Sequence, residues 1–172
     1  AGQYSVVITD ANNCIQYDTV NLTQPSVITN DSSITVINNV DCNGNSSGSI
    51  NIAPAGGTLP YSFVWSNGAT SEDLNNIPAG TYSVNILDSF LCSSVSYTYI
   101  ITEPTALNIS STINSVSCNG LSDGSIDAFV SGGIASYNYI WSNGDSTEDI
   151  SGLSAGTYTL QVYDMNNCSF SD

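Results

Sequence analysis

The cysteines are the residues whose type and spacing most directly suggest chemistry. Cys42 and Cys92 are 50 positions apart, and so are Cys118 and Cys168. Equal spacing in two places predicts two disulfides, Cys42 with Cys92 and Cys118 with Cys168, and leaves Cys14 to pair with a cysteine before residue 1. In the chain-entropy model, closing a loop of that length contributes roughly 4 kcal/mol.

Two other arrangements of the cysteines stay open. Cys14 with Cys42 and Cys92 with Cys118 would tie neighbouring domains together, although their spacings of 28 and 26 positions are less regular. All five thiols could also be free and buried. Either disulfide scheme requires an oxidising compartment.

Carboxylates offer the second possible chemistry. The pairs Glu72-Asp73 and Glu148-Asp149 recur at the same point of two similar segments, near Asn and Ser oxygens that suit Ca²⁺. Adjacent residues of a strand point to opposite faces, so we favour a solvated acidic loop and predict no metal or other cofactor. A glycosidase would need two carboxylates across a cleft, which a small repeated domain does not offer, and we therefore predict no enzyme activity.

The residue types that are absent exclude most other functions. The chain has no Lys, Arg or His against 15 Asp plus Glu, a formal net charge of −15. Ser-His and Cys-His pairs, Lys nucleophiles and cationic phosphate clamps are therefore impossible. Because the surface repels phosphate, we expect no nucleic-acid binding and no direct lipid binding.

Three further sets of residues have a structural and a functional interpretation. Asp10, Asp88 and Asp164 each stand four positions before a cysteine, where a turn-forming role is more typical than metal binding. Trp65 and Trp141 could stack on sugars, but their register with neighbouring aromatic residues favours the core. The triplets that begin at Asp18 and Asp145 resemble an O-glycosylation acceptor, which makes Thr19 and Ser146 weak candidates for modification.

These residues must be positioned by short strands. Apolar residues make up 41% of the chain and alternate with polar ones, as in Tyr82, Val84 and Ile86, which predicts antiparallel strands with one buried face. Asn67-Gly68 and Asn143-Gly144 predict tight turns. The strands expected in one repeat cover residues 34–37, 49–53, 61–66, 81–88 and 95–102, with a weaker segment at 74–77.

The same motifs occur twice, 76 positions apart, and part of a third copy opens the chain. The fold class expected is therefore all-β: tandem immunoglobulin-like β-sandwich repeats of about 77 residues, each with one disulfide. Pro25 and Pro104 mark short, stiff boundaries. We expect residues 1–25 to be the C-terminal part of a repeat, 26–104 a complete repeat, and 105–172 a repeat without its last strand.

One ordered set of motifs occurs in both copies. The first copy comprises Cys42-Asn43-Gly44, Gly48-Ser49-Ile50, Gly56-Gly57, Pro60-Tyr61, Trp65 to Gly68, Ala79 to Tyr82 and Asp88 to Cys92. The second comprises Cys118-Asn119-Gly120, Gly124-Ser125-Ile126, Gly132-Gly133, Ser136-Tyr137, Trp141 to Gly144, Ala155 to Tyr158 and Asp164 to Cys168. This ordered set resembles the SprB repeat over essentially the whole chain. One residue departs from the pattern, since Leu91 precedes Cys92 where Gly or Asn is more usual, and a changed loop is expected there.

The resemblance implies a very large cell-surface adhesin of gliding Bacteroidetes, exported by type IX secretion. The chain would be a shaft segment, extracellular and associated with the outer membrane. Its partners would be the secretion or gliding machinery and, through regions outside this segment, an extracellular polysaccharide or other surface ligand. Alternatively, the repeats are themselves multivalent carbohydrate- or protein-binding modules.

Overall fold

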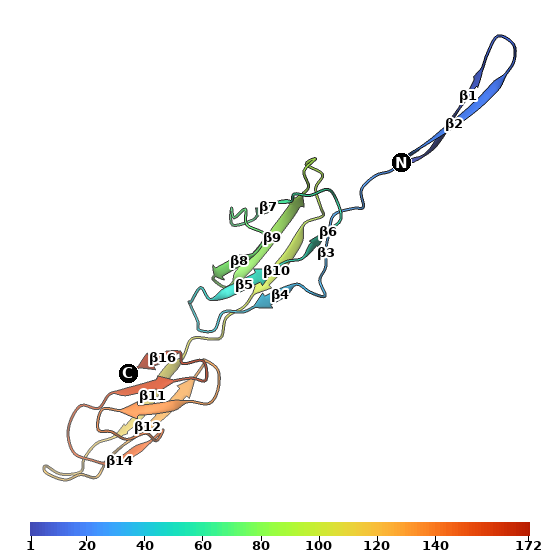
Figure 1. Ribbon diagram of the computed structural model, residues 1–172. Helices are drawn as coiled ribbons and strands as arrows, with labels where there is room; N and C mark the ends of the chain where they lie inside the picture. The colour runs from blue at the N-terminus through green and yellow to red at the C-terminus, as the bar shows by residue number, and fades with distance from the viewer. The chain divides into compact units, whose positions relative to one another are not determined.

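The computed structural model describes residues 1–172 and is built from β-strands and loops, without helices (Figure 1). It therefore contains no helix that is long and apolar enough to cross a membrane. The chain forms two compact units. Unit 1 comprises Ala1–Thr35, Ile52–Glu72 and Ser83–Tyr97, and unit 2 comprises Val36–Asn51, Asp73–Tyr82 and Thr98–Asp172. This division does not test the three predicted domains, which stay a prediction.

The strands of unit 1 pair antiparallel. β1 (Gly2–Thr9) and β2 (Ile15–Leu22) form a hairpin, and β3 (Thr29–Asn30) pairs with β6 (Pro54–Ala55). β7 (Ser62–Trp65) pairs with β9 (Gly80–Leu87), in a sheet of order β10-β9-β7 that includes β10 (Tyr97–Ile101). The first three residues of β9, and all of β10 except Tyr97, belong to unit 2.

The β1–β2 hairpin shows that alternation alone does not bury a strand. Tyr4, Val6 and Ile8 are 57%, 51% and 56% exposed, whereas their counterparts 78 positions later in β9 are at most 7% exposed. The same pattern is therefore buried only where other strands of a repeat cover it.

Unit 2 contains three antiparallel sheets, each with three strands. One has the order β4-β5-β8, from β4 (Val36–Asn38), β5 (Gly48–Asn51) and β8 (Leu74–Ile77). The second has the order β11-β12-β14, from β11 (Asn108–Asn114), β12 (Gly124–Ser131) and β14 (Ile150–Leu153). The third has the order β13-β15-β16, from β13 (Asn138–Trp141), β15 (Leu160–Tyr163) and β16 (Ser169–Ser171).

The last two of these sheets form a β-sandwich. Trp141, Leu160 and Val162 of one sheet share a buried cluster with Ile126 and Ile150 of the other. The alternating β-branched and aromatic residues thus bury one face of each strand, as expected for a two-layer fold. The prediction of an all-β, sandwich-type fold is confirmed.

The middle copy of the motifs buries the equivalent residues. Ile50, Trp65, Leu74, Val84 and Ile86 lie 76 positions before Ile126, Trp141, Ile150, Leu160 and Val162, and all are at most 8% exposed. The two copies therefore use the same core positions.

The Asn-Gly segments form tight turns, as predicted, and only their glycines have positive φ. Gly68 and Gly144 have φ of 86° and 92°, and each donates its backbone N–H to the carbonyl of the preceding tryptophan at 3.0 Å. Asn67 accepts the N–H of Ala69 with its side-chain oxygen at 3.1 Å. The turn therefore needs Gly for its backbone and Asn for its side chain.

Candidate functional site: the disulfide-linked junction

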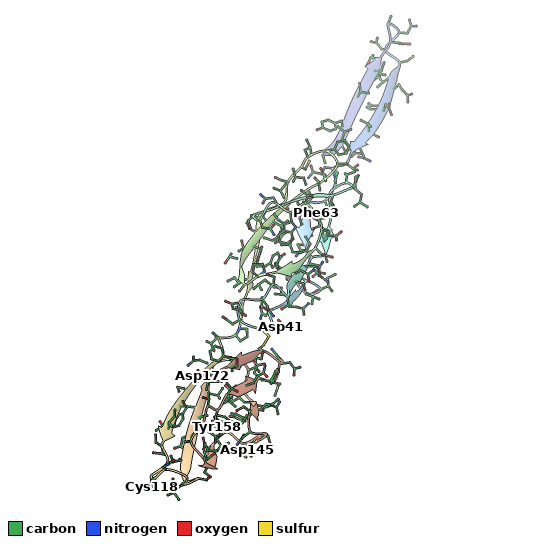
Figure 2. The ribbon with its side chains drawn as sticks, turned by 90° about the vertical axis from the view of Figure 1, so that its left-hand side faces the viewer. Asp41, Phe63, Cys118, Asp145, Tyr158 and Asp172 are labelled. Carbon is green, nitrogen blue, oxygen red and sulfur yellow. A yellow bond between two sulfur atoms is a disulfide. The ribbon has the colours of Figure 1, made fainter.

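One disulfide is present, and it joins Cys42 to Cys168 across 126 positions, with their Cα atoms 5.6 Å apart. Cys42 lies in the loop between β4 and β5, and Cys168 lies in the turn between β15 and β16. The yellow bond beside Asp41 in Figure 2 marks it. Both predicted disulfides, Cys42 with Cys92 and Cys118 with Cys168, are therefore wrong in their pairing. The rival scheme is not found either, and Cys14, Cys92 and Cys118 are free and exposed.

The geometry of one repeat explains why Cys118 does not pair with Cys168. Cys118 precedes β12, whereas the turn that holds Cys168 lies against Gly133 and Ile134, which follow β12. An eight-residue strand separates the two ends by about 25 Å, far beyond the roughly 7 Å that a disulfide can bridge between Cα atoms. Figure 2 shows Cys118 at the end of this sandwich remote from the disulfide. Cys42 and Cys92 occupy the equivalent positions in the middle copy, so the same argument applies to them.

The turn that holds Cys168 is organised by Asp164. One carboxylate oxygen of Asp164 accepts the backbone N–H groups of Asn166 and Cys168, both at 2.9 Å, and the other accepts that of Ile134 at 2.8 Å. Asp164 is only 1% exposed. The carboxylate therefore fixes the cysteine at the end of the sheet, which is the turn-forming role that the sequence predicts.

Asp88 builds the same turn before Cys92. Its carboxylate accepts the N–H groups of Phe90 and Cys92 at 2.9 Å and that of Thr58 at 3.2 Å. The loop has not changed as expected at Leu91, because that residue adopts φ of 61° where Asn167 has 60° in the last turn. The hydrogen bonds of the turn determine its backbone, and Leu91 tolerates the left-handed conformation.

The loop that carries Cys42 is closed by Asp41. The Asp41 carboxylate accepts hydrogen bonds from the Ser47 hydroxyl, from Asn45 and from the Cys42 N–H. The hydrogen bond from the Ser47 hydroxyl is the largest influence on the carboxyl and helps to hold the pKa of Asp41 below its ordinary value. Cys42 is therefore presented on a preorganised loop.

The same loop contacts the segment around Pro104. Glu103 accepts the Gly44 N–H with its carboxylate at 2.6 Å, and the Asn43 side-chain amide donates to the Pro104 carbonyl at 3.0 Å. The side-chain amide of Asn166 donates to the Asp41 carbonyl at 2.9 Å. These three hydrogen bonds lie beside the disulfide. The loop that carries Cys42 is therefore held in place by polar contacts as well as by a covalent bond.

A cleft of about 470 Å³ surrounds the disulfide. It is lined by Cys42, Asn43, Asn45, Pro104, Thr105, Ala106, Leu107, Gly133, Asp164, Asn167, Cys168, Ser169 and Phe170. Glu103, Asn43 and Asn166 were not predicted as contact residues. The repeated Cys-Asn-Gly motif is the signal that could have identified Asn43. The backbone conformation and the side chain of Asn43 serve the contact with the segment around Pro104 and not the packing of the core.

The carboxylate pairs lie apart from this junction. Glu148 and Asp149 are exposed, and one carboxylate oxygen of Asp149 accepts the N–H of Ala128 in β12 at 2.9 Å. Glu72 is exposed and Asp73 is half-buried. No group of three or more Cys, Asp or Glu residues is arranged to hold a metal, and calcium binding stays untested.

The pKa of Tyr139 is affected by the negative charge of the pair Glu148-Asp149. Burial raises the pKa of Tyr139, and the neighbouring Glu148 raises it further through its charge and a hydrogen bond. The phenol therefore stays protonated near neutral pH, where it serves as a hydrogen-bond donor.

The tryptophans belong to the core. Trp65 and Trp141 are 2% and 4% exposed, and their indole N–H groups donate at 2.9 Å to the carbonyls of Ser71 and Thr147. A sugar-stacking platform at these rings is therefore excluded by burial. The candidate modification sites Thr19, on β2, and Ser146, in a loop, are both exposed, and their modification stays a prediction.

Comparison with known proteins identifies the repeat itself. The family model of the SprB repeat matches residues 29–70 and 110–146. No curated protein matches the chain. These two matches confirm the resemblance to the SprB repeat that the motifs of the chain predict.

Proposed function

We propose that the chain is a segment of the repetitive shaft of a cell-surface adhesin. The observation that carries this proposal is the bond between Cys42 and Cys168, which links the first loop of one copy of the motif to the last turn of the next. A tensile load that reaches the junction is borne by a covalent bond as well as by the folded strands. Such a bond also fits an oxidising, extracellular location.

The finer proposal follows from the SprB repeat family. The adhesin would be exported by type IX secretion and moved along the outer membrane by the gliding machinery. Regions outside this segment would bind an extracellular polysaccharide or another surface ligand. The net charge of −15 supports a shaft, because like charge keeps neighbouring filaments apart.

The alternative is that the repeats themselves bind carbohydrate or protein. Solvent-facing residues differ between the copies, as in Asn51 against Asp127, although a repeated binding site should keep its contacts. The burial of both tryptophans removes the aromatic platform that such a site could use. Both observations favour the shaft.

The test has two parts, on cells and on the purified chain. Antibodies against the chain should label intact cells of the producing organism, and deletion of the codons for residues 26–104 should shorten the surface filament without abolishing attachment. The purified oxidised chain should not sediment with extracellular polysaccharide from that organism. Binding of the chain to the polysaccharide would favour the alternative, and a lack of surface labelling would overturn both.

A further inference from the structure

Two of the three free cysteines, Cys92 and Cys118, lie in the same local structures as the two bonded ones. Cys92 follows Asp88 in a turn whose backbone closes with Asp88 N–H donating to the Cys92 carbonyl at 3.0 Å. Asp164 and Cys168 make the same hydrogen bond at the same distance. The turn that holds Cys92 therefore has the same backbone hydrogen bond as the turn that holds Cys168.

The loop around Cys118 matches the loop around Cys42 with its hydrogen-bonding residues exchanged. Asp41 accepts from the Ser47 hydroxyl in the first loop, whereas Asp123 accepts from the Ser117 hydroxyl at 2.6 Å in the second. The donor and the acceptor have changed places, but the closure is the same. Each loop presents its cysteine after the first residue of this pair.

A cleft beside Cys92 provides an independent observation. Its volume is about 580 Å³, and it is formed largely by the counterparts of the residues that form the cleft at Cys168. Pro25 and Ser26 stand for Pro104 and Thr105, and Gly57, Asp88 and Cys92 stand for Gly133, Asp164 and Cys168. At Cys168 the cleft also contains residues of the Cys42 loop, whereas the cleft at Cys92 has no such loop among its lining residues.

The two clefts also share a backbone hydrogen bond between equivalent residues. Gly57 donates its N–H to the Ser26 carbonyl at 2.8 Å, and Gly133 donates to the Thr105 carbonyl at 2.9 Å. The occupant that fits the cleft at Cys92 is therefore the one seen at Cys168, a Cys-Asn-Gly loop.

We propose that the repeats form a disulfide ladder, in which the Cys-Asn-Gly cysteine of each repeat bonds the Asp-turn cysteine of the next repeat. Cys92 receives the loop of the repeat before 26–104, and Cys118 bonds the turn of a repeat after 105–172. Cys14 is a turn cysteine of the same kind, because Asp10 accepts its N–H at 2.9 Å. This inference rests on the proposed function as part of a longer array.

Each bond of the ladder forms by thiol–disulfide exchange. Two cysteine thiols lose two protons and two electrons to a small-molecule or protein disulfide, which leaves as two thiols. Oxidised glutathione serves as that disulfide in the experiment below. No other co-reactant is needed.

A chain extended by one repeat tests the ladder. Residues 1–104 are followed directly by residues 26–172, so that Pro104 stands where Pro25 precedes Ser26, and the product is refolded with reduced and oxidised glutathione. Peptic peptides are mapped without reduction, since the chain has no Lys or Arg for trypsin. The ladder predicts two disulfides, Cys42 of the first copy with Cys92 of the second, and Cys42 of the second copy with Cys168, with three free thiols.

Matched variants separate the two copies. C92S in the first copy should leave both disulfides intact, whereas C92S in the second copy should remove one and free the first Cys42. Loss of a disulfide in the first-copy variant, or a peptide that joins Cys118 to Cys168, would mean pairing within repeats and would overturn the ladder. That result would leave the proposed shaft standing, because the shaft is tested on cells and by polysaccharide binding.

Discussion

At the scale of the residue, one aspartate builds each cysteine-bearing turn. Asp10, Asp88 and Asp164 each accept two backbone N–H groups with one carboxylate oxygen, the second being that of the cysteine four positions later. Because the side chain replaces missing backbone partners, the turn keeps its shape when its other residues vary.

Replacing Leu91 should stabilise the protein. Leu91 has φ of 61° and is 74% exposed, so its side chain gains little from burial while its backbone is strained. We expect Leu91→Asn to raise the free energy of unfolding by about 1 kcal/mol, since Asn tolerates this conformation. Urea denaturation measures the change, and Asn167→Leu is the matched reverse substitution, expected to lower stability by a similar amount. An unchanged midpoint for both would contradict the strain.

The Asp88 carboxylate should make stability depend on pH. Burial raises the pKa of Asp88, but hydrogen bonds from the N–H groups of Cys92, Phe90 and Thr58 outweigh it and leave the pKa below the ordinary value of 3.8. The unfolded chain then binds more protons as the pH falls, so the contribution is complete above pH 3.8 and disappears as the pH falls through the folded-state pKa.

The comparison of Asp88→Asn with the unaltered chain isolates this contribution. The difference in the free energy of unfolding should be largest near neutral pH and should shrink as the pH falls below that ordinary value. Urea unfolding at a series of pH values measures it. Asp127→Asn, at an exposed position of β12, is the control and should show little difference at any pH. A difference for Asp88→Asn that is constant with pH would refute the assignment.

At the scale of the element, glycines let the end of a strand meet the Asp turn. Gly133 follows β12 with φ of 60°, and a Cβ atom there would lie 2.7 Å from a carboxylate oxygen of Asp164. Tyr137 donates its hydroxyl to the Gly132 carbonyl at 2.6 Å and holds the same corner. The strand, the corner and the cysteine turn are therefore one structural feature.

Gly133→Ala should consequently destabilise the fold. The added methyl group combines left-handed backbone strain with a clash against Asp164, and we expect a loss of about 2 to 3 kcal/mol. Gly144→Ala is the control, because Gly144 also has positive φ but no atom lies within 4 Å of its would-be Cβ, and about 1 kcal/mol is expected there. Thermal or urea unfolding compares the two, and equal losses would mean that the contact with Asp164 is unimportant.

At the scale of the whole molecule, the bond between Cys42 and Cys168 determines how far the chain can extend. The 126 positions between these residues are closed into one loop. A cross-link of this kind restricts the unfolded state, and the restriction grows with loop length. Cys42→Ser removes this cross-link, and Cys118→Ser is the matched control because Cys118 is free.

Removing the disulfide should lower equilibrium stability. In the chain-entropy model a loop of 126 residues contributes about 5 kcal/mol, which is an upper value when the unfolded chain retains structure. Urea unfolding under oxidising conditions should show this loss for Cys42→Ser and no comparable loss for Cys118→Ser. Equal stability of the two variants would show that Cys42 is not bonded in solution.

Stretching a single molecule should reveal the same bond directly. With the disulfide intact, the residues between Cys42 and Cys168 cannot be drawn out, whereas in Cys42→Ser they can. At about 3.5 Å per residue, the variant should extend about 440 Å further in force spectroscopy. Cys118→Ser should extend no further than the unaltered chain, and an extra length in that variant would contradict the observed pairing.

Much of the fold follows from local chemistry that the sequence displays. The alternation of Tyr82, Val84 and Ile86 predicts a strand with one buried face, and β9 has that face. The segment 74–77 is predicted as a weak strand and is β8. The placement of both tryptophans in the core and the turn-forming role of Asp88 and Asp164 are also predicted correctly, because each depends on residues within a few positions of one another.

The pairing of the cysteines was decided only by the tertiary structure. The equal spacing of 50 positions counts residues along the chain, whereas a disulfide depends on distance in space. β12 separates Cys118 from the turn that holds Cys168, so two cysteines of one repeat lie at opposite ends of its sheet. The sequence alone determined the repeats, the strands and the turns, and the length and direction of the strands decided which cysteine meets which.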